Sequence, residues 1–278
     1  MSSDYQQYES MLRKYILDKL PQVLKKPHRF IHYPFIDPGS VYNGNVWDWD
    51  TYWSVYAILG LTDYMDLGQI QDILIHAKGN VENFMDHQLE DGYIPMMIEV
   101  ADWPEPYLNL KHKEGVLMNM HKPFLCQQIC LISEYCHDYQ WAKKFYHKLE
   151  AYFTCYRKNY YKENTHLYVW CDDIMIGVDN DPSSFGRPKF STANIYLNSF
   201  MVMELKAMGT LCQNFGEEER ADFYRAEADD LIHAVQEECW DKRDKIYYSV
   251  DVDIHTRSFD WFHQGLGVFW KSLPIKVR

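Results

Sequence analysis

The sequence feature that most constrains the fold is a regular alternation between two kinds of helical segment. Four segments carry apolar residues along one helical face only: 5–23, 67–88, 139–160 and 217–240. The three segments that alternate with them are apolar on nearly every side: 51–61, 123–136 and 193–212. A helix that is hydrophobic all round must be buried all round. The order therefore predicts an all-α fold in which antiparallel hairpins, each pairing an outer helix with an inner one, close into an (α/α)6 toroid.

The connections favour a toroid over its two alternatives, an irregular helical bundle and an open solenoid of helix pairs. A solenoid requires a repeat of fixed period, and no sequence motif recurs along the chain. The connections that enter the apolar helices are long and rich in aromatic residues: 26–47, 90–121 and 161–192. Long loops gathered on one rim indicate an active-site face. Gly92 follows the second amphipathic segment and is predicted to be its C′ cap.

The sequence accounts for part of a closed toroid. About seven to eight of the twelve helices that six hairpins need can be recognised, followed by a small β-excursion near 245–253. We expect residues 1–278 to form a single barrel domain that holds the N-terminal two-thirds of the ring. An incomplete ring exposes the apolar faces of inner helices, and such faces recruit partners. We therefore expect a homodimer or a complementing C-terminal fragment.

Composition and charge argue against several classes of function. The 28 Lys and Arg residues against 40 Asp and Glu give a net charge of −12, which repels the phosphate backbone of nucleic acids. No apolar run approaches the length of a membrane span and the N-terminus has no signal-peptide core, so we expect a cytoplasmic protein that binds no membrane. Seven cysteines without a CxxC motif indicate reduced thiols, and the 12 histidines show no metal-binding spacing. We therefore expect no metal site, and because nucleotide-binding and serine-hydrolase motifs are also missing, we expect neither of those two chemistries.

The segment 44–53, GNVWDWDTYW, combines the residue types of a carbohydrate subsite. Carboxylates accept hydrogen bonds from sugar hydroxyls, and indole rings present apolar faces on which sugars stack. The alternative is local: Asp48 or Asp50 can serve as the N-cap of the helix that follows, and the aromatic rings can form ordinary core. Because a cap and a core do not require two carboxylates and three tryptophans together, we favour a binding site that includes Trp47 and Trp53.

The loop 170–188 contains four aspartates within ten residues: Asp172, Asp173, Asp179 and Asp181. Crowded carboxylates raise one another's pKa, and a carboxyl group with a raised pKa is what a general acid requires at neutral pH. A solvated acidic turn and a calcium loop are the alternatives. The calcium loop fails because Ser184 and Phe190 stand where an EF-hand needs Gly and Glu. Asp181 precedes a proline and is expected to be held in the turn.

Six short segments occur in the order and spacing typical of glycoside hydrolase family 63: NVWDWDTYW, DGYIP, HKPFLCQQ, GVDNDPSSFGRP, IYLNSF and LPIKVR. From about Asn43 to its end, the chain resembles this family, which includes processing α-glucosidases and mannosylglycerate-hydrolase-like enzymes and is related to trehalases. The resemblance implies an (α/α)6 barrel, no cofactor, and an exo-acting, inverting α-glycosidase that uses two carboxyl groups. It implies Asp179 as the general acid, and as substrate-binding residues Trp47, Asp48, Asp50, Trp53, Tyr93, Lys122, Asn180 and Asn198.

The chain departs from the family pattern in places that bear on function. Residues 174–177 read IMIG where the family has Glu-Ser-Gly, so a glutamate next to the acid is missing, and the trehalase signature is absent. The family's general base is a glutamate near the C-terminal helices, which we expect to lie beyond Arg278. We therefore expect an oligosaccharide or small glycoside as substrate, and no turnover by residues 1–278 alone. The alternative is a non-catalytic carbohydrate-binding or scaffold protein with a degenerate toroid.

Overall fold

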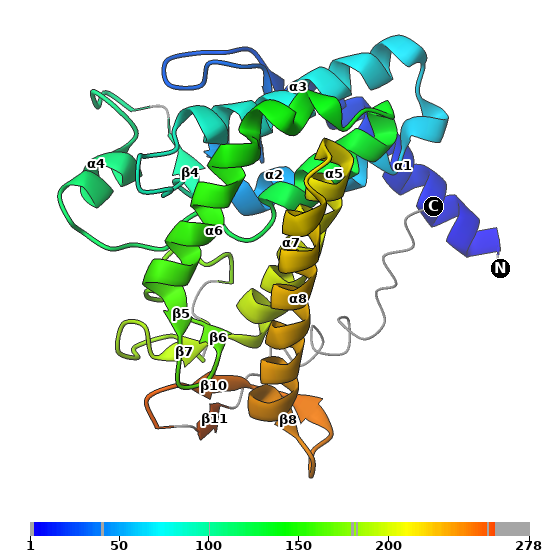
Figure 1. The fold of residues 1–278 in the computed structure, drawn as a ribbon. Helices are drawn as coiled ribbons and strands as arrows, with labels where there is room; N and C mark the ends of the chain where they lie inside the picture. Colours follow the sequence, from blue (N-terminus) through cyan, green and yellow to red (C-terminus); the bar gives the residue numbers. More distant parts are fainter. Residues whose placement is uncertain are drawn as a thin grey trace.

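The computed structural model of the protein describes residues 3–39, 42–99, 101–178, 181, 183–254 and 256–258 (Figure 1). Eight α-helices form most of the described chain: α1 Ser3–Val23, α2 Asp48–Leu59, α3 Leu67–Asp86, α4 Tyr107–Lys113, α5 Leu125–Cys136, α6 Tyr146–Tyr160, α7 Ile195–Phe215 and α8 Glu218–Ala234. Seven of them occupy the predicted segments. The eighth, α4, lies inside the long connection before α5 and is too short to show a helical period in the sequence.

The pair α7 and α8 shows how the sequence builds a helical hairpin. The side chain of Asn194 caps the start of α7 by accepting from the backbone N–H groups of Tyr196 and Leu197. At the other end Gly216 adopts a positive φ of 85°, which favours glycine and turns the chain directly into α8. The two helices lie side by side over most of their length (Figure 1). As predicted, α7 is buried on most sides and α8 on one face.

Two predictions about helix burial are wrong in part. The apolar stripe of α1 is exposed over its first turns, where Tyr5, Tyr8 and Leu12 are 57–69% exposed, and it becomes buried only near Leu20. The inner helix α2 is not buried all round, since Tyr56 is 55% exposed. Apolar residues in the sequence therefore predicted that these helices are buried. They did not show which helical turns are covered by other parts of the described chain and which stay exposed.

The long connections fold into short strand pairs on the rim instead of long sheets. The antiparallel pairs are β1 Leu24–Lys25 with β2 Phe35–Ile36, β3 Val46–Trp47 with β4 Met97–Ile98, β5 Tyr161–Lys162 with β6 Leu167–Tyr168, and β8 Trp240–Asp241 with β9 Ile246–Tyr247. A three-stranded sheet places β10 Ser249–Asp251 between β7 Thr192–Ala193 and β11 Thr256–Ser258. The predicted β-excursion near 245–253 is therefore confirmed.

Buried asparagines fasten these rim segments to the helices. On α3, Asn80 exchanges two hydrogen bonds with the backbone of Ile36, and Asn83 accepts from the N–H groups of His32 and Tyr33. An amide side chain offers a donor and an acceptor together, so it pairs with a backbone much as a neighbouring strand does. The rim loops are consequently held in fixed positions by the helical framework.

Close backbone contact explains two glycines. A Cβ atom at Gly79 would lie 1.8 Å from the carbonyl oxygen of Pro34, so α3 can approach the β2 segment only because this side chain is absent. Gly92 has a φ of 90° and lies in a tight turn closed by its N–H on the carbonyl of Leu89. Because α3 ends at Asp86 with His87 as its C-cap, the prediction of Gly92 as the C′ cap of that helix is wrong.

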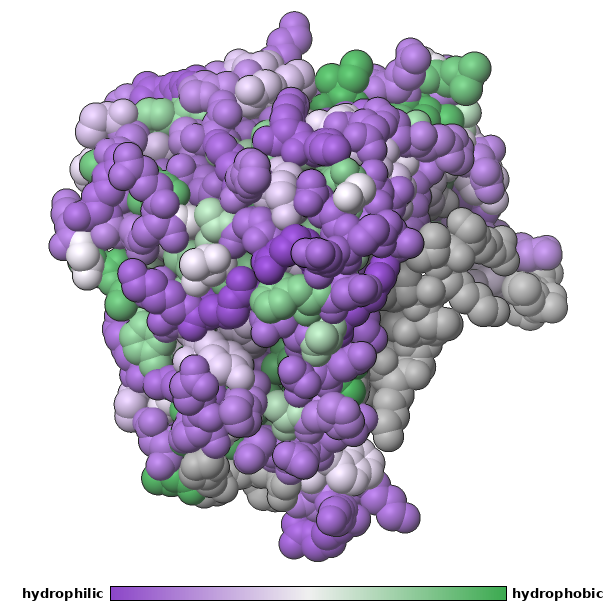
Figure 2. All heavy atoms as spheres, in the orientation of Figure 1, coloured by the Kyte–Doolittle hydropathy of each residue, from purple (hydrophilic) through white to green (hydrophobic). Residues whose placement is uncertain are grey.

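The surface agrees with the acidic, polar composition. On the face seen in Figure 2, hydrophilic residues predominate, and hydrophobic residues occur in small separate patches. No helix among the described residues is long and apolar enough to cross a membrane. All seven cysteines lie in the described part of the chain, and none of them is paired in a disulfide there.

Candidate active site

A cleft of about 240 Å³ brings three separate segments of the chain together. Its described lining comes from the β3–α2 junction, from the segment before α5 and from the loop after β6: Tyr42, Trp47, Asp48, Trp49, Asp50, Lys122, Met175 and Gly177. Two larger grooves, of about 540 and 460 Å³, lie between α6 and α8 and beside α1. The smaller cleft is the stronger candidate, since it alone of the three combines tryptophans with buried charged groups from several elements.

The start of α2 aims its acidic residues at this cleft. The preceding strand β3 pairs with β4, and the N–H of Asp48 donates to the carbonyl of Met96 at 3.0 Å. The N-cap residue is Trp47, so the alternative in which Asp48 or Asp50 caps the helix is wrong. Both carboxylates instead lie within the first turn, where the helix dipole favours negative charge.

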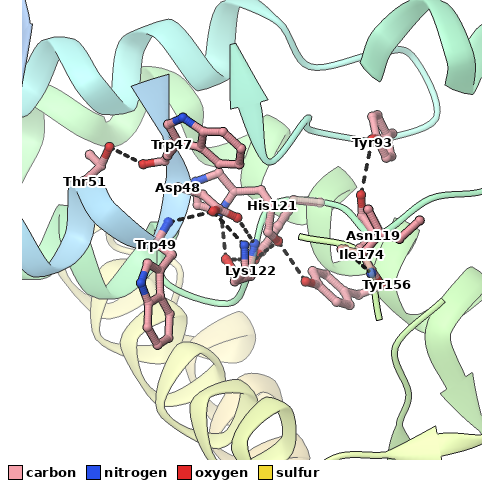
Figure 3. A network of polar contacts seen from close by, with 11 residues as sticks. Trp47, Asp48, Trp49, Thr51, Tyr93, Asn119, His121, Lys122, Tyr156 and Ile174 are labelled. Atoms are coloured by element: carbon pink, nitrogen blue, oxygen red, sulfur yellow. Dashed lines mark hydrogen bonds and ion pairs between the residues drawn. The ribbon is translucent and has the colours of Figure 1, made fainter. Parts of the chain in front are cut away.

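Asp48 and Lys122 form a buried ion pair beneath the cleft (Figure 3). The Nζ of Lys122 lies 2.9 Å from Oδ1 of Asp48, and its backbone N–H donates to Oδ2 at 2.7 Å. Next to the pair, Nδ1 of His121 donates to the carbonyl of Lys122 at 2.7 Å. Burial lowers the pKa of His121, which keeps this ring neutral and leaves Lys122 as the cation that balances Asp48.

Asp50 and Trp47 both line the cleft and both carry a polar group. Burial raises the pKa of Asp50, the nearby Asp48 raises it further, and Lys122 lowers it in part. The indole Nε1 of Trp47 is buried and has no hydrogen-bond partner among the described residues. A buried donor without a partner costs free energy, so a ligand oxygen that reached this N–H would be bound favourably. Tyr42 packs edge-on against Trp47 at 5.5 Å between ring centroids.

The loop after β6 closes the cleft from the other side. Asn119 fastens this loop by accepting from the N–H of Cys171 at 2.7 Å and donating to the carbonyl of Ile174 at 3.0 Å (Figure 3). A Cβ atom at Gly177, whose φ is 95°, would lie 3.2 Å from the ring of Trp49, so the glycine lets the loop backbone rest on that indole. The predicted general acid Asp179 and its neighbour Asn180 lie outside the described residues.

Three of the predicted ligand residues lie elsewhere. Trp53 packs in an aromatic cluster, with ring centroids 4.9 Å from Tyr52 and 5.9 Å from Phe124. Tyr93 is fully buried and stacks on His112. They do not belong to the described lining of the cleft, so their predicted contact with a sugar has no support from this geometry.

Asn198 is also absent from that lining. Its amide is buried and pairs with the N–H and the carbonyl of Tyr168, both at 2.8 Å, in the way that Asn80 and Asn83 hold the first rim segment. The geometry therefore gives Asn198 a structural task, holding β6 to α7, and does not support its predicted contact with a sugar.

The other aspartates of the loop have structural partners. Asp181 is fully buried and accepts from the N–H and hydroxyl of Ser183 and from the amide of Asn194, which confirms that the turn holds it. Asp172 pairs with Lys189 at 3.2 Å. The described residues contain no group of three or more His, Cys, Asp or Glu that could hold a metal ion.

Sequence reasoning missed a fully buried acid, Glu204 on α7. Burial raises its pKa to about 7. Its two carboxylate oxygens accept from the N–H groups of Cys126 and Gln127, at the start of α5. A signal was present, because Glu204 is the one acidic residue in the apolar segment 193–212. Trp49, Tyr42 and Met175 also line the cleft without having been predicted to do so.

Comparison with known proteins identifies the family. Residues 44–262 match the family described as the mannosylglycerate hydrolase MGH1-like glycoside hydrolase domain. The chain belongs to this family. In this MGH1-like glycoside hydrolase domain, the matched residues include the whole described lining of the cleft except Tyr42. No curated protein matches the chain in sequence.

Solved structures agree on the fold of this MGH1-like domain. The family 63 mannosylglycerate hydrolase from Thermus thermophilus, in complex with glucose, aligns with a TM-score of 0.65 at 15% identity, over 94% of this chain and 72% of that one. The neutral trehalase Nth1 from Saccharomyces cerevisiae gives 0.51 at 13% identity, over 81% and 50%. A family 78 rhamnosidase from Bacillus sp. GL1 gives 0.55 at 18%, over 78% and 20%. The predicted all-α architecture of α/α-barrel type and the resemblance to family 63 are confirmed.

Proposed function

We propose that this glycoside hydrolase domain is an exo-acting, inverting α-glycosidase that binds a non-reducing α-glucosyl or α-mannosyl unit in the cleft. The observation that carries the proposal is the cleft itself. Asp50, a half-buried carboxyl group with a raised pKa, and Trp47, whose buried indole N–H has no hydrogen-bond partner among the described residues, both line a hollow of about 240 Å³. Sugar hydroxyls can donate to the first group and accept from the second.

The predicted general acid Asp179 stands close in the sequence to a residue that lines the cleft. Gly177 lines the cleft, and two residues of extended chain reach at most about 7 Å. The resemblance to family 63 implies that the carboxyl group of Asp179 protonates the glycosidic oxygen. As Asp181 and Asp172 are already engaged in hydrogen bonds or ion pairs, Asp179 is the stronger candidate in this loop.

The chemistry needs two carboxyl groups with room for water between them. The acid donates its proton to the glycosidic oxygen as that bond breaks, while a carboxylate base takes a proton from the water that attacks the opposite face. In inverting enzymes the two groups lie about 6.5–9.5 Å apart. We place the base outside the described residues, since Asp48 is neutralised by Lys122 and Asp50 shares its side of the cleft.

The proposal is tested by a substrate screen on the longest natural form of the protein. Aryl α-glucosides, aryl α-mannosides, glucosylglycerate and mannosylglycerate are incubated with the enzyme, and NMR reports the anomer released first. Hydrolysis with release of the inverted, β-anomer supports the proposal. Asp179→Asn should reduce turnover by at least about 10³-fold and leave sugar affinity within about two-fold of wild type.

Two outcomes of this screen contradict the proposal. Release of the α-anomer would refute the inverting mechanism. Sugar binding without any turnover would favour the alternative, a carbohydrate-binding protein that has lost catalysis. Asp173→Asn is the matched control in the same loop and should leave turnover unchanged, because Asp173 does not belong to the described lining of the cleft.

A further inference from the structure

Lys122 holds one carboxylate with two different donors. Its ammonium group and its backbone N–H bind the two oxygens of Asp48, and both side chains are almost completely buried, at 2% and 0% exposure. Desolvating two charges costs nearly as much as their attraction returns, so a buried ion pair adds little to stability. The pair is therefore better explained by the geometry that it imposes than by the stability that it adds.

The backbone around Lys122 is itself fixed from α6. The hydroxyl of Tyr156 donates to the carbonyl of His121 at 2.8 Å (Figure 3). The hydroxyl of Tyr152 donates to the carbonyl of Lys122 at 3.1 Å. The ring of His121 adds a further donor on the Lys122 carbonyl. The position of Lys122 is therefore fixed by helix α6, and Lys122 in turn fixes the position of Asp48.

That residue is the first of α2. Asp48 also accepts from the N–H of Trp49 at 2.6 Å, so its carboxylate ties Lys122 to the first helical turn. We propose that Lys122 is a positioning residue, whose ammonium group acts through Asp48 to fix the first turn of α2 so that Trp47 and Asp50 face the sugar. The inference rests on the proposed function, because the cleft must bind a sugar for this positioning to matter.

The charges around the cleft make the pKa of Asp50 a measurable consequence of the Lys122–Asp48 pair. Among the described lining residues Lys122 carries the only positive charge. Burial is the main cause of the raised pKa of Asp50; Asp48 raises this pKa further and Lys122 lowers it. Removing the charge of Lys122 must therefore raise the pKa of Asp50, whereas removing the charge of Asp48 must lower it. These shifts report that the charges of the pair act on Asp50, and the positioning role is read from sugar affinity and its pH dependence in the same variants.

The experiment follows Asp50 directly, without a substrate. The carboxyl ¹³C signals of aspartate-labelled protein are titrated, and Asp50→Asn assigns the signal of Asp50. Lys122→Met and Lys122→Gln should raise its pKa, and Asp48→Asn should lower it. Asp48→Asn leaves a buried ammonium group unpaired and is the variant most prone to unfold. The double variant Lys122→Gln/Asp48→Asn carries no charge at either position and is therefore measured as well. In this variant the pKa of Asp50 should return toward its wild-type value.

Sugar binding is measured on the same variants. Glucose and mannose affinity should fall about ten-fold in Lys122→Met, and its pH dependence should move with the pKa of Asp50. Lys148→Met is the control: the ammonium group of this lysine donates to the backbone carbonyl of Met85 at 2.6 Å, and the residue does not belong to the described lining of the cleft. It should leave both the pKa of Asp50 and sugar affinity unchanged.

The outcomes separate the inference from the proposed function. An Asp50 pKa that stays constant in every variant overturns the inference. So does a loss of affinity in Lys122→Met without any change in pH dependence, because Lys122 would then contact the sugar itself. If the Asp50 pKa moves as predicted but no sugar binds, the charge coupling between Lys122 and Asp50 is supported and the proposed function is refuted.

Discussion

Glu204 makes the stability of this protein depend on pH in a way that can be worked out from its surroundings. The carboxyl group is fully buried between α7 and the start of α5. Burial raises its pKa to about 7, although the N–H groups of Cys126 and Gln127 bind it and act in the opposite direction. No lysine or arginine among the described residues forms an ion pair with it. Ionisation therefore costs free energy in the folded state.

The sign follows from proton binding. The ordinary pKa of the group is 4.5, so between pH 4.5 and about 7 the unfolded chain has lost this proton while the folded protein keeps it. Stability is then fully present below pH 4.5 and declines as the pH rises through 7. A pKa difference of about 2.5, at about 1.4 kcal/mol for each pKa unit, corresponds to a loss of roughly 3 kcal/mol in the free energy of unfolding.

The assay is urea denaturation of wild type, Glu204→Gln and Glu219→Gln at a series of pH values from 4.5 to 8. Glu204→Gln should be less stable than wild type at pH 4.5, by about 1–3 kcal/mol, since its amide NH2 group would face one of the two backbone N–H donors. Glu204→Gln has no carboxyl group that ionises at this position, so its free energy of unfolding does not decline with pH for this reason. Relative to wild type, it should therefore become more stable by about 3 kcal/mol between pH 4.5 and pH 8. Glu219, exposed on α8, is the control and should follow wild type. A gap that stays constant with pH would refute the argument.

Two further predictions concern the cleft wall and the helix packing. Trp47→Phe removes the unpartnered indole N–H and should lower sugar affinity with little change in melting temperature; Trp53→Phe should lower stability by about 1–3 kcal/mol and leave affinity unchanged. Calorimetric titration and thermal melts of both variants check this, and the opposite pattern would exchange the roles of the two tryptophans. Gly79→Ala places a methyl group against the carbonyl of Pro34 and should cost about 3 kcal/mol or more, measured by urea denaturation. Gly60→Ala, where the new atom makes only ordinary contacts at 3.5 Å, should be nearly neutral, and equal stabilities of the two variants would contradict the packing argument.

The sequence determined the local structure of this protein well. Helical periodicity located seven helices to within a few residues, because the burial of an apolar face repeats every 3.6 residues whatever the fold. The motif GNVWDWDTYW was also enough to identify the start of α2 as a candidate binding segment. Asp48 and Asp50 do line the cleft, and Lys122, predicted from a distant motif, lies beside them.

The tertiary structure decided which of these residues can meet a ligand. Trp47 and Trp53 are six residues apart in one motif, yet one lines the cleft and the other packs against Phe124. Asp48 and Lys122 are separated by 74 residues, and their pairing exists only because α6 fixes the backbone at Lys122 in space. Side-chain partners and the burial that shifts a pKa depend on packing between segments remote in sequence. Residue types and their spacing determine where helices form. The contacts between side chains of distant segments form only when the helices pack together.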